Sequence, residues 1–110
     1  MYKRGNVVLV PFPFSDLSSA KTRPAVVVSV EDLQRDTGNL IVAMITSVEH
    51  KTRFDCEIRD WQSARLVSPS WVRAKLATIE QGLVRYQPGS LTHNDLSEVE
   101  KKIRIALALH

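Results

Sequence analysis

Residues 21–29 read Lys21-Thr22-Arg23-Pro24-Ala25-Val26-Val27-Val28-Ser29 and decide the fold. A polar, charged segment runs directly into an apolar and largely β-branched one, which is the composition of a buried strand. Pro24 fixes its own φ and biases Arg23 toward extended geometry, so the beginning of this strand is stiff. Arginine presents a permanently charged, planar fork of donors that suits phosphate. An arginine beside a strand is also commonly a solvated surface residue. Other features of the sequence are needed to distinguish a phosphate-binding arginine from a solvated surface arginine.

The composition indicates one globular domain over residues 1–110. Hydrophobic residues make up 44% of the chain and charged residues 25%, and the formal net charge is +3. This weak positive charge is compatible with a polyanionic partner without requiring one. The single cysteine, Cys56, excludes a disulfide framework. No apolar run approaches the roughly 18 residues of a membrane span. We therefore expect a soluble, cytoplasmic protein without membrane contact.

Short apolar or alternating segments follow one another along the chain, bounded by proline, glycine or polar residues. They predict strands at residues 7–10, 25–30, 40–45, 54–59, 71–79 and 83–87. Between them, residues 32–39 are polar and close on a turn signal, and Pro88-Gly89 predicts another turn. Residues 12–22 predict a loop of a length that is more often functional than neutral.

The last segment differs, because its apolar residues recur at helical spacing. Thr92 and Asp95 resemble a capping box, with a carboxylate in the place usually held by Glu or Gln. The apolar positions are Leu96, Val99, Ile103 and Leu107. Since the strands come in a run rather than alternating with helices, the sheet should be mainly antiparallel. The predicted class is mainly β (β+α): a small barrel of short strands with a C-terminal amphipathic helix over an open side or end.

Metal and cofactor chemistry have no support in the sequence. His50, His93 and His110 are not at metal-ligand spacing, and the glycines are scattered singly without a phosphate-binding loop. Cys56 alternates with Phe54 and Ile58, which favours a small core residue over a nucleophile. We expect no metal and no cofactor.

Polar groups at strand ends are the remaining candidates for function. Thr46 and Ser47 stand where the third strand stops, and Trp71, Arg73 and Lys75 share one face of a later strand. A basic face with an aromatic suits a single-stranded nucleic acid with stacked bases. The alternatives are that the hydroxyls cap a turn, that the cations form a solvated face, and that Trp71 lies in a dimer interface.

Several of these segments together resemble the MazF/PemK family of toxins. The resemblance covers nearly the whole chain in order, and it rests on Arg4-Gly5 with strand 7–10, on segment 21–29, on Ala43-Met44-Ile45-Thr46-Ser47, on residues 70–79 and on the closing helix. It implies a homodimeric, metal-independent endoribonuclease on an SH3-like barrel, which a cognate antitoxin neutralises. The implied catalytic residues are Arg23 and Thr46. Lys21, Ser47, Arg73 and Lys75 would then bind the single-stranded RNA.

The sequence also departs from the family pattern. Asn6 stands where an acidic residue is usual, Phe12-Pro13-Phe14 makes the first loop more aromatic, and Ser18 stands where some members carry a glutamate. These differences leave the cleavage sequence and the acid–base partner open.

The implied chemistry is attack of the RNA 2′-hydroxyl on the adjacent phosphorus, which leaves a 2′,3′-cyclic phosphate and a 5′-hydroxyl without a metal. Arg23 is suited to holding the charge of the phosphorane, and Thr46 to contacting an oxyanion. A permanently charged guanidinium is a poor general base. Asp16, Lys21 and His50 are the candidates for help with the proton.

Two alternatives from other functional classes stay open. The family's fold is shared with CcdB-type toxins, so the chain could instead be a non-catalytic toxin that binds a protein target such as gyrase. It could also be a degenerate module that retains only antitoxin binding.

Overall fold

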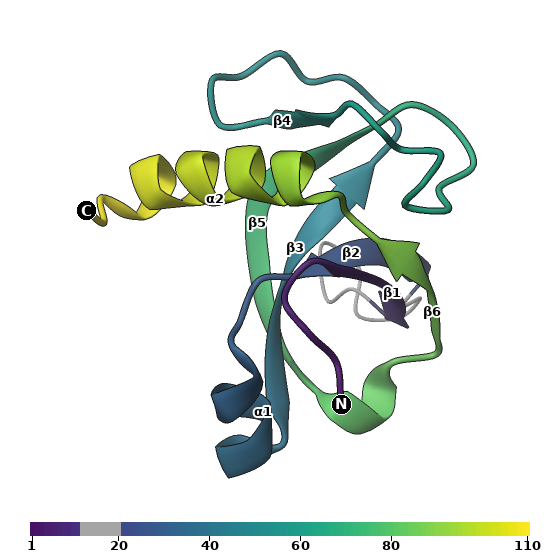
Figure 1. The fold of residues 1–110 in the computed structure, drawn as a ribbon, viewed down its shortest axis with the longest axis vertical. Coiled ribbons are helices and arrows are strands. Elements are labelled where there is room, and N and C mark those ends of the chain that lie inside the picture. Colours follow the sequence, from purple (N-terminus) through teal and green to yellow (C-terminus); the bar gives the residue numbers. More distant parts are fainter. Residues whose placement is uncertain (12–20) are drawn as a thin grey trace.

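The computed structural model of the chain describes residues 1–11 and 21–110. Within these ranges six strands form one antiparallel sheet in the order β4-β5-β3-β2-β1-β6. The strands are β1 (Asn6–Pro11), β2 (Thr22–Val27), β3 (Asn39–Thr46), β4 (Cys56–Ile58), β5 (Ser70–Glu80) and β6 (Tyr86–Ser90). The helices are α1 (Glu31–Thr37), the 3₁₀ turn η1 (Gln81–Leu83) and α2 (His93–Leu107). The sheet curves into a half-barrel with α2 across it (Figure 1), which confirms the predicted fold class.

Both faces of the central strands are buried, which explains their continuous apolar sequence. On one face a cluster that includes Val7, Val26, Ala43 and Val72 packs against Leu96, Val99 and Ile103 of α2. On the other face lies a second cluster, whose buried members are Val8, Val10, Ala25, Val27, Leu40, Val42 and Ile79. The helix thus covers the first face, as the amphipathic pattern predicted.

The beginning of α2 confirms only half of the predicted capping box. The Thr92 hydroxyl accepts a hydrogen bond from the backbone N–H of Asp95 at 3.1 Å. The Asp95 carboxylate accepts from the backbone N–H groups of Arg59, at 3.1 Å, and Asp60, at 2.9 Å. Asp95 is only 3% exposed. The carboxylate therefore ties α2 to the segment that follows β4. No helix in the described ranges has both the length and the hydropathy to cross a membrane.

The prediction of a single helix was wrong, because residues 31–37 form α1. Its buried residue is polar: Gln34 is 4% exposed, accepts from the backbone N–H of Tyr2 at 3.1 Å and donates to Gln81 at 2.6 Å. A short helix that buries an amide leaves no apolar periodicity to detect. The predicted turn signal at Gly38 marks the C-cap of this helix, at φ 75°.

The prediction of a turn at Pro88-Gly89 was also wrong, since both residues lie inside β6. β6 is an edge strand, where a missing N–H is tolerated. Gly89 lies opposite Val7, and a Cβ built on it would stand 2.7 Å from the carbonyl oxygen of Ala64. The glycine thus allows close approach of the segment between β4 and β5.

Other boundaries moved by a few residues. β2 begins at Thr22 and ends at Val27, so Arg23 and Pro24, which precede the predicted strand at 25–30, belong to the strand. The predicted strand at 54–59 shortens to β4, and the one at 83–87 becomes η1 followed by β6. Residues 12–20, with Asp16 and Ser18, lie outside the described residues.

We predict that Asp95→Ala lowers the free energy of unfolding by about 3 kcal/mol, because it removes a buried charged acceptor and leaves the backbone N–H groups of Arg59 and Asp60 without their partner. Urea denaturation followed by circular dichroism measures the change. Asp32→Ala is the matched control: its side chain is 76% exposed in an i,i+3 pair with Arg35, and its loss should cost less than about 0.5 kcal/mol. Equal midpoints for the two variants would contradict the anchoring role of Asp95.

Candidate functional site

The register of β2 and β3 brings the two predicted catalytic residues together. Ala25 lies opposite Met44, and Val27 lies opposite Val42. Continuing this register by two residues places Arg23 opposite Thr46. Directly opposed residues of an antiparallel pair project from the same face. The guanidinium and the hydroxyl thus come from separate strands to one end of the sheet.

Arg23 sits on a fixed backbone with an exposed side chain. It lies opposite Val10 in β1, next to the half-buried Pro24 and the fully buried Ala25. Across residues 1–11 and 21–110, nothing forms a hydrogen bond or ion pair with its guanidinium. A fixed cation with available donors fits the phosphate-binding role better than that of a structural ion pair.

The Thr46 hydroxyl is oriented by a turn at the end of β3. It accepts a hydrogen bond from the backbone N–H of Val48 at 3.1 Å, and the residue is half-buried. A hydroxyl that accepts one bond still has its own hydrogen to donate. Ser47 and Lys21 are exposed and adjoin this end of the sheet through their neighbours Thr46 and Thr22.

The basic face of β5 begins beside Thr46. Trp71 lies opposite Thr46, and Val72 is buried in the first core cluster. Arg73 follows two residues after Trp71, but the register with β3 shifts opposite residues 72–76 of β5, so alternation does not carry the predicted common face as far as Lys75. Trp71 and Arg73 are half-buried and Lys75 is exposed.

Arg73 is held by a carboxylate that the sequence analysis missed. Its Nε donates to Asp55 at 3.0 Å, and the Asp55 side chain is only 5% exposed. The other carboxylate oxygen of Asp55 accepts from the backbone N–H and the hydroxyl of Thr52, at 3.0 and 2.7 Å. The Thr-x-x-Asp spacing was a detectable signal for this local turn, but the contact with Arg73 was not.

These contacts determine the pKa of Asp55. Burial by itself raises the pKa, but the hydrogen bonds from Thr52 and the Arg73 guanidinium outweigh it and bring the pKa below the ordinary 3.8. The carboxylate is therefore ionised at neutral pH and orients Arg73.

Cys56 is a core residue, as predicted. It is 5% exposed, and burial, followed by the nearby Glu98 carboxylate, raises the pKa of its thiol to about 11. A neutral buried thiol is not a nucleophile. His50 is exposed in the segment between β3 and β4. The described residues contain no cluster of three potential metal ligands.

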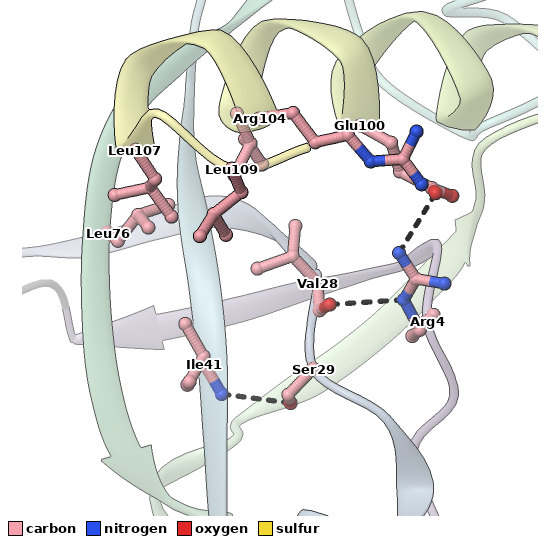
Figure 2. A pocket seen from close by; sticks show the side chains of 10 residues that line it. Arg4, Val28, Ser29, Ile41, Leu76, Glu100, Arg104, Leu107 and Leu109 are labelled. Atoms are coloured by element: carbon pink, nitrogen blue, oxygen red, sulfur yellow. Dashed lines mark hydrogen bonds and ion pairs between the residues drawn. The ribbon is translucent and has the colours of Figure 1, made fainter.

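One pocket lies away from all six predicted site residues. It encloses about 290 Å³ between the C-terminal part of α2 and residues of β3, β5 and the segment after β2 (Figure 2). Apolar side chains line most of it, and the Arg4–Glu100 ion pair, at 3.1 Å, stands at its side. This pocket does not belong to the Arg23–Thr46 arrangement.

A second pocket does include predicted residues. It encloses about 390 Å³ and is lined by Thr52, Phe54, Arg73, Ala74, Lys75 and Ala106. Two of the four residues predicted to bind RNA therefore line one cavity beside an aromatic ring. The sequence analysis assigned no such role to Phe54.

Comparison with known proteins identifies a family and solved structures to which this chain is similar. A family model described as the PemK-like, MazF-like toxin of type II toxin–antitoxin systems matches residues 3–107. A mycobacterial endoribonuclease in complex with its cognate antitoxin superposes with a TM-score of 0.83 at 17% identity, over 100% of this chain and 98% of that one. MazF from Deinococcus radiodurans gives 0.79 at 22% identity, over 98% and 97% of the two chains.

A third solved structure has the same fold. The Mycobacterium tuberculosis toxin MazF-mt6 gives a TM-score of 0.76 at 20% identity, over 96% of this chain and 98% of that one. No curated protein sequence matches the chain significantly. At these identities the structural matches show a common MazF-like fold.

We predict a pH-dependent stability contribution from Asp55. Since its folded-state pKa is below 3.8, the carboxylate stabilises the fold fully above that ordinary value, and the contribution is lost as the pH falls through the folded-state pKa. Urea midpoints of the wild type and Asp55→Asn, measured from pH 7 down to about pH 2, should therefore converge at the acid end. A difference that stays constant over this range would contradict the assignment.

Proposed function

This chain belongs to the family of PemK-like and MazF-like toxins of type II toxin–antitoxin systems, and we propose that it acts as a metal-independent endoribonuclease on single-stranded RNA. The observation that carries the proposal is the register of β2 with β3, whose last pair is Ala25 with Met44 and which, extended by two residues, puts Arg23 opposite Thr46. The description of two structural relatives as endoribonucleases supports it.

The proposed reaction is an intramolecular transesterification. The 2′-oxygen attacks the adjacent phosphorus, the bond to the 5′-oxygen of the next nucleotide breaks, and the products are a 2′,3′-cyclic phosphate and a 5′-hydroxyl. Arg23 stabilises the additional negative charge of the phosphorane and donates the proton to the leaving oxygen. Thr46 donates a hydrogen bond to a non-bridging oxygen. Fixed donors of this kind contribute on the order of 10²–10³ in rate each.

The 2′-hydroxyl proton goes to a group other than Arg23, because a guanidinium carries only donors and no acceptor atom. Lys21 stands two residues before Arg23, and His50 four residues after Thr46. Both side chains are exposed. Asp16, the remaining candidate, lies outside the described residues. Lys21, Ser47, Arg73 and Lys75 hold the RNA on either side of the cleaved bond.

The proposal includes a cognate antitoxin and a cytoplasmic location. Relatives have been solved with their antitoxins, as the MazE–MazF structures from Deinococcus radiodurans illustrate. An acidic, extended antitoxin tail would cover the cations around Arg23 and so exclude the RNA. Inhibition of translation and growth would follow from cleavage of messenger RNA.

The proposal also includes a homodimer. Ile105, Leu107 and Leu109, at the C-terminal end of α2, are 50–60% exposed although they are apolar. The pocket of Figure 2 opens beside Leu107 and Leu109. Exposed apolar residues gathered at one helix end favour a contact between two copies of the chain.

We predict that Arg23→Ala lowers RNA cleavage by about 100- to 1000-fold or more, because the charge on the phosphorane loses its partner. Cleavage of a labelled transcript in EDTA measures the rate, and mapping of the 5′ ends identifies the products. Thr46→Val should also lose activity. Arg35→Ala, on the exposed face of α1, is the control and should cleave like the wild type.

The same experiment separates the alternatives. Unchanged urea midpoints would show that the Arg23 variant is folded, as expected for an exposed side chain. Retained cleavage in Arg23→Ala would overturn the assignment of Arg23. Inhibition of gyrase supercoiling without any RNA cleavage by the wild type would favour the non-catalytic toxin instead.

For the dimer, we predict a sedimentation mass of twice the 12.4 kDa chain at micromolar concentration. Leu107→Glu together with Leu109→Glu should shift the protein to monomer, because a charge on each side chain opposes its burial. Arg104→Glu changes charge on the same helix turn without removing an apolar contact and serves as the comparison. A monomeric wild type would contradict this part of the proposal.

A further inference from the structure

We infer that the pocket between residues 52–54 and the middle of β5 is a nucleotide subsite of the RNA site. In it a base stacks on Phe54, and Arg73 and Lys75 contact the adjoining phosphates. The inference rests on the proposed function and adds to it a place where a nucleotide beside the cleaved bond is held.

The cavity has the size and construction of a ligand site. Its volume of about 390 Å³ falls in the range of small-molecule pockets. Three separate parts of the fold line it: the segment before β4, with Thr52 and Phe54; β5, with Arg73 and Lys75; and α2, with Ala106. A pocket built by three elements keeps its shape better than a cleft within one loop.

The pocket combines a flat ring with positive charge. Phe54 is half-buried, and the Arg53 guanidinium lies over its ring, 4.7 Å from the centroid. Guanidinium groups and aromatic rings are the surfaces on which single-stranded bases stack. The ring of Phe54 therefore already lies under one planar group, the Arg53 guanidinium, and a nucleic-acid base is also planar.

Asp55 fixes the guanidinium of Arg73 at the edge of the cavity. The Asp55 side chain is 5% exposed, and its oxygens accept from Thr52 and Arg73. Arg73 and Lys75 line the cavity. Because only the Nε of Arg73 donates to Asp55 and the side chain stays 21% exposed, its terminal N–H groups can donate to a phosphate.

Phe54 is held in place from both sides. Asp55, which follows it, bonds to Thr52 and Arg73, and the ammonium group of Lys102 in α2 donates to the carbonyl of Arg53 at 2.9 Å. The segment also closes on itself, since the N–H of Asp55 donates to the carbonyl of Thr52 at 3.2 Å. A ring fixed before binding loses little entropy when a base stacks on it.

The pocket adjoins the Arg23–Thr46 arrangement along the chain. Trp71 lies opposite Thr46, and Arg73 follows two residues later in β5, where the register with β3 shifts. Two residues of a strand span about 7 Å. An RNA chain with its reactive phosphate at Arg23 and Thr46 therefore reaches Arg73 by continuing along β5. An acidic peptide would match the cations but would leave the ring of Phe54 without a planar partner.

The test uses the full-length Arg23→Ala protein, because its expected loss of cleavage leaves time to measure binding before the RNA is cut. Short RNA oligonucleotides carry 2-aminopurine at successive positions, since the fluorescence of this base falls when it stacks. We expect quenching at one position. In the double variant with Phe54→Leu, the quenching is lost and affinity falls about 5- to 100-fold, in line with the loss of one stacked base. Phe54→Trp retains both.

Charge variants test the phosphate contacts independently. In the same background, Arg73→Gln and Lys75→Gln should each lower the slope of log affinity against log salt by about 0.7, the contribution of one phosphate contact on a single strand. Arg35→Gln removes an equal charge on α1 and should leave the slope unchanged. Urea midpoints check that each variant is folded.

The outcomes separate this inference from the proposed function. If Phe54→Leu changes neither quenching nor affinity while wild-type cleavage is intact, the subsite is wrong and the endoribonuclease proposal stands. If the wild type neither cuts nor binds RNA, the proposed function fails and the subsite fails with it. If an acidic peptide binds in a Phe54-dependent manner and RNA does not, the pocket is a protein-binding site and the inference is overturned.

Discussion

The pairing of β2 with β3 is the constraint on which the rest of the molecule depends. Ala25 and Val27 face Met44 and Val42, and both faces of β2 are packed in core clusters. A slip of one residue would exchange these two faces and bury the wrong side chains, so the register is firmly specified. Extended by two residues beyond its last pair, the same register puts Arg23 opposite Thr46. The packing of the core therefore fixes the relative position of the two residues proposed to be catalytic.

Two buried carboxylates connect the segments around β4 to the rest of the fold. Asp95 accepts from two backbone N–H groups after β4, which joins α2 to the β4–β5 segment. Asp55 accepts from Thr52 and Arg73, which joins the β3–β4 segment to β5. Each satisfies its charge with hydrogen bonds, as a buried carboxylate must. Between them they hold both connections that flank the Thr46 end of the sheet.

The sequence predicted the elements that show a regular hydrophobic period. It did not predict contacts between residues that are far apart in the chain. The apolar strands and the helix with Val99 and Ile103 were recognisable because their patterns are local. The α1 helix was missed because it buries Gln34, and β6 was placed too early because Pro88 and Gly89 have the composition of a turn. Arg23 and Thr46 were named through a family resemblance. The roles of Asp55 and Phe54 depend on β5, some 18 residues away for the Arg73 contact, and no local pattern encodes that distance.

No hydrogen bond or ion pair to the Arg23 guanidinium is present among residues 1–11 and 21–110, so the proposed cleavage is best explained without a base held beside this arginine. If the cation mainly stabilises the phosphorane, acceleration depends on holding the 2′-oxygen, the phosphorus and the leaving oxygen in line. A flexible single strand is aligned only when nucleotides on both sides of the bond are bound. The binding energy of those nucleotides then offsets the cost of aligning the reacting phosphate. Contacts that select the RNA sequence would therefore also set the rate. A pocket such as the one around Phe54 would contribute to kcat as well as to affinity.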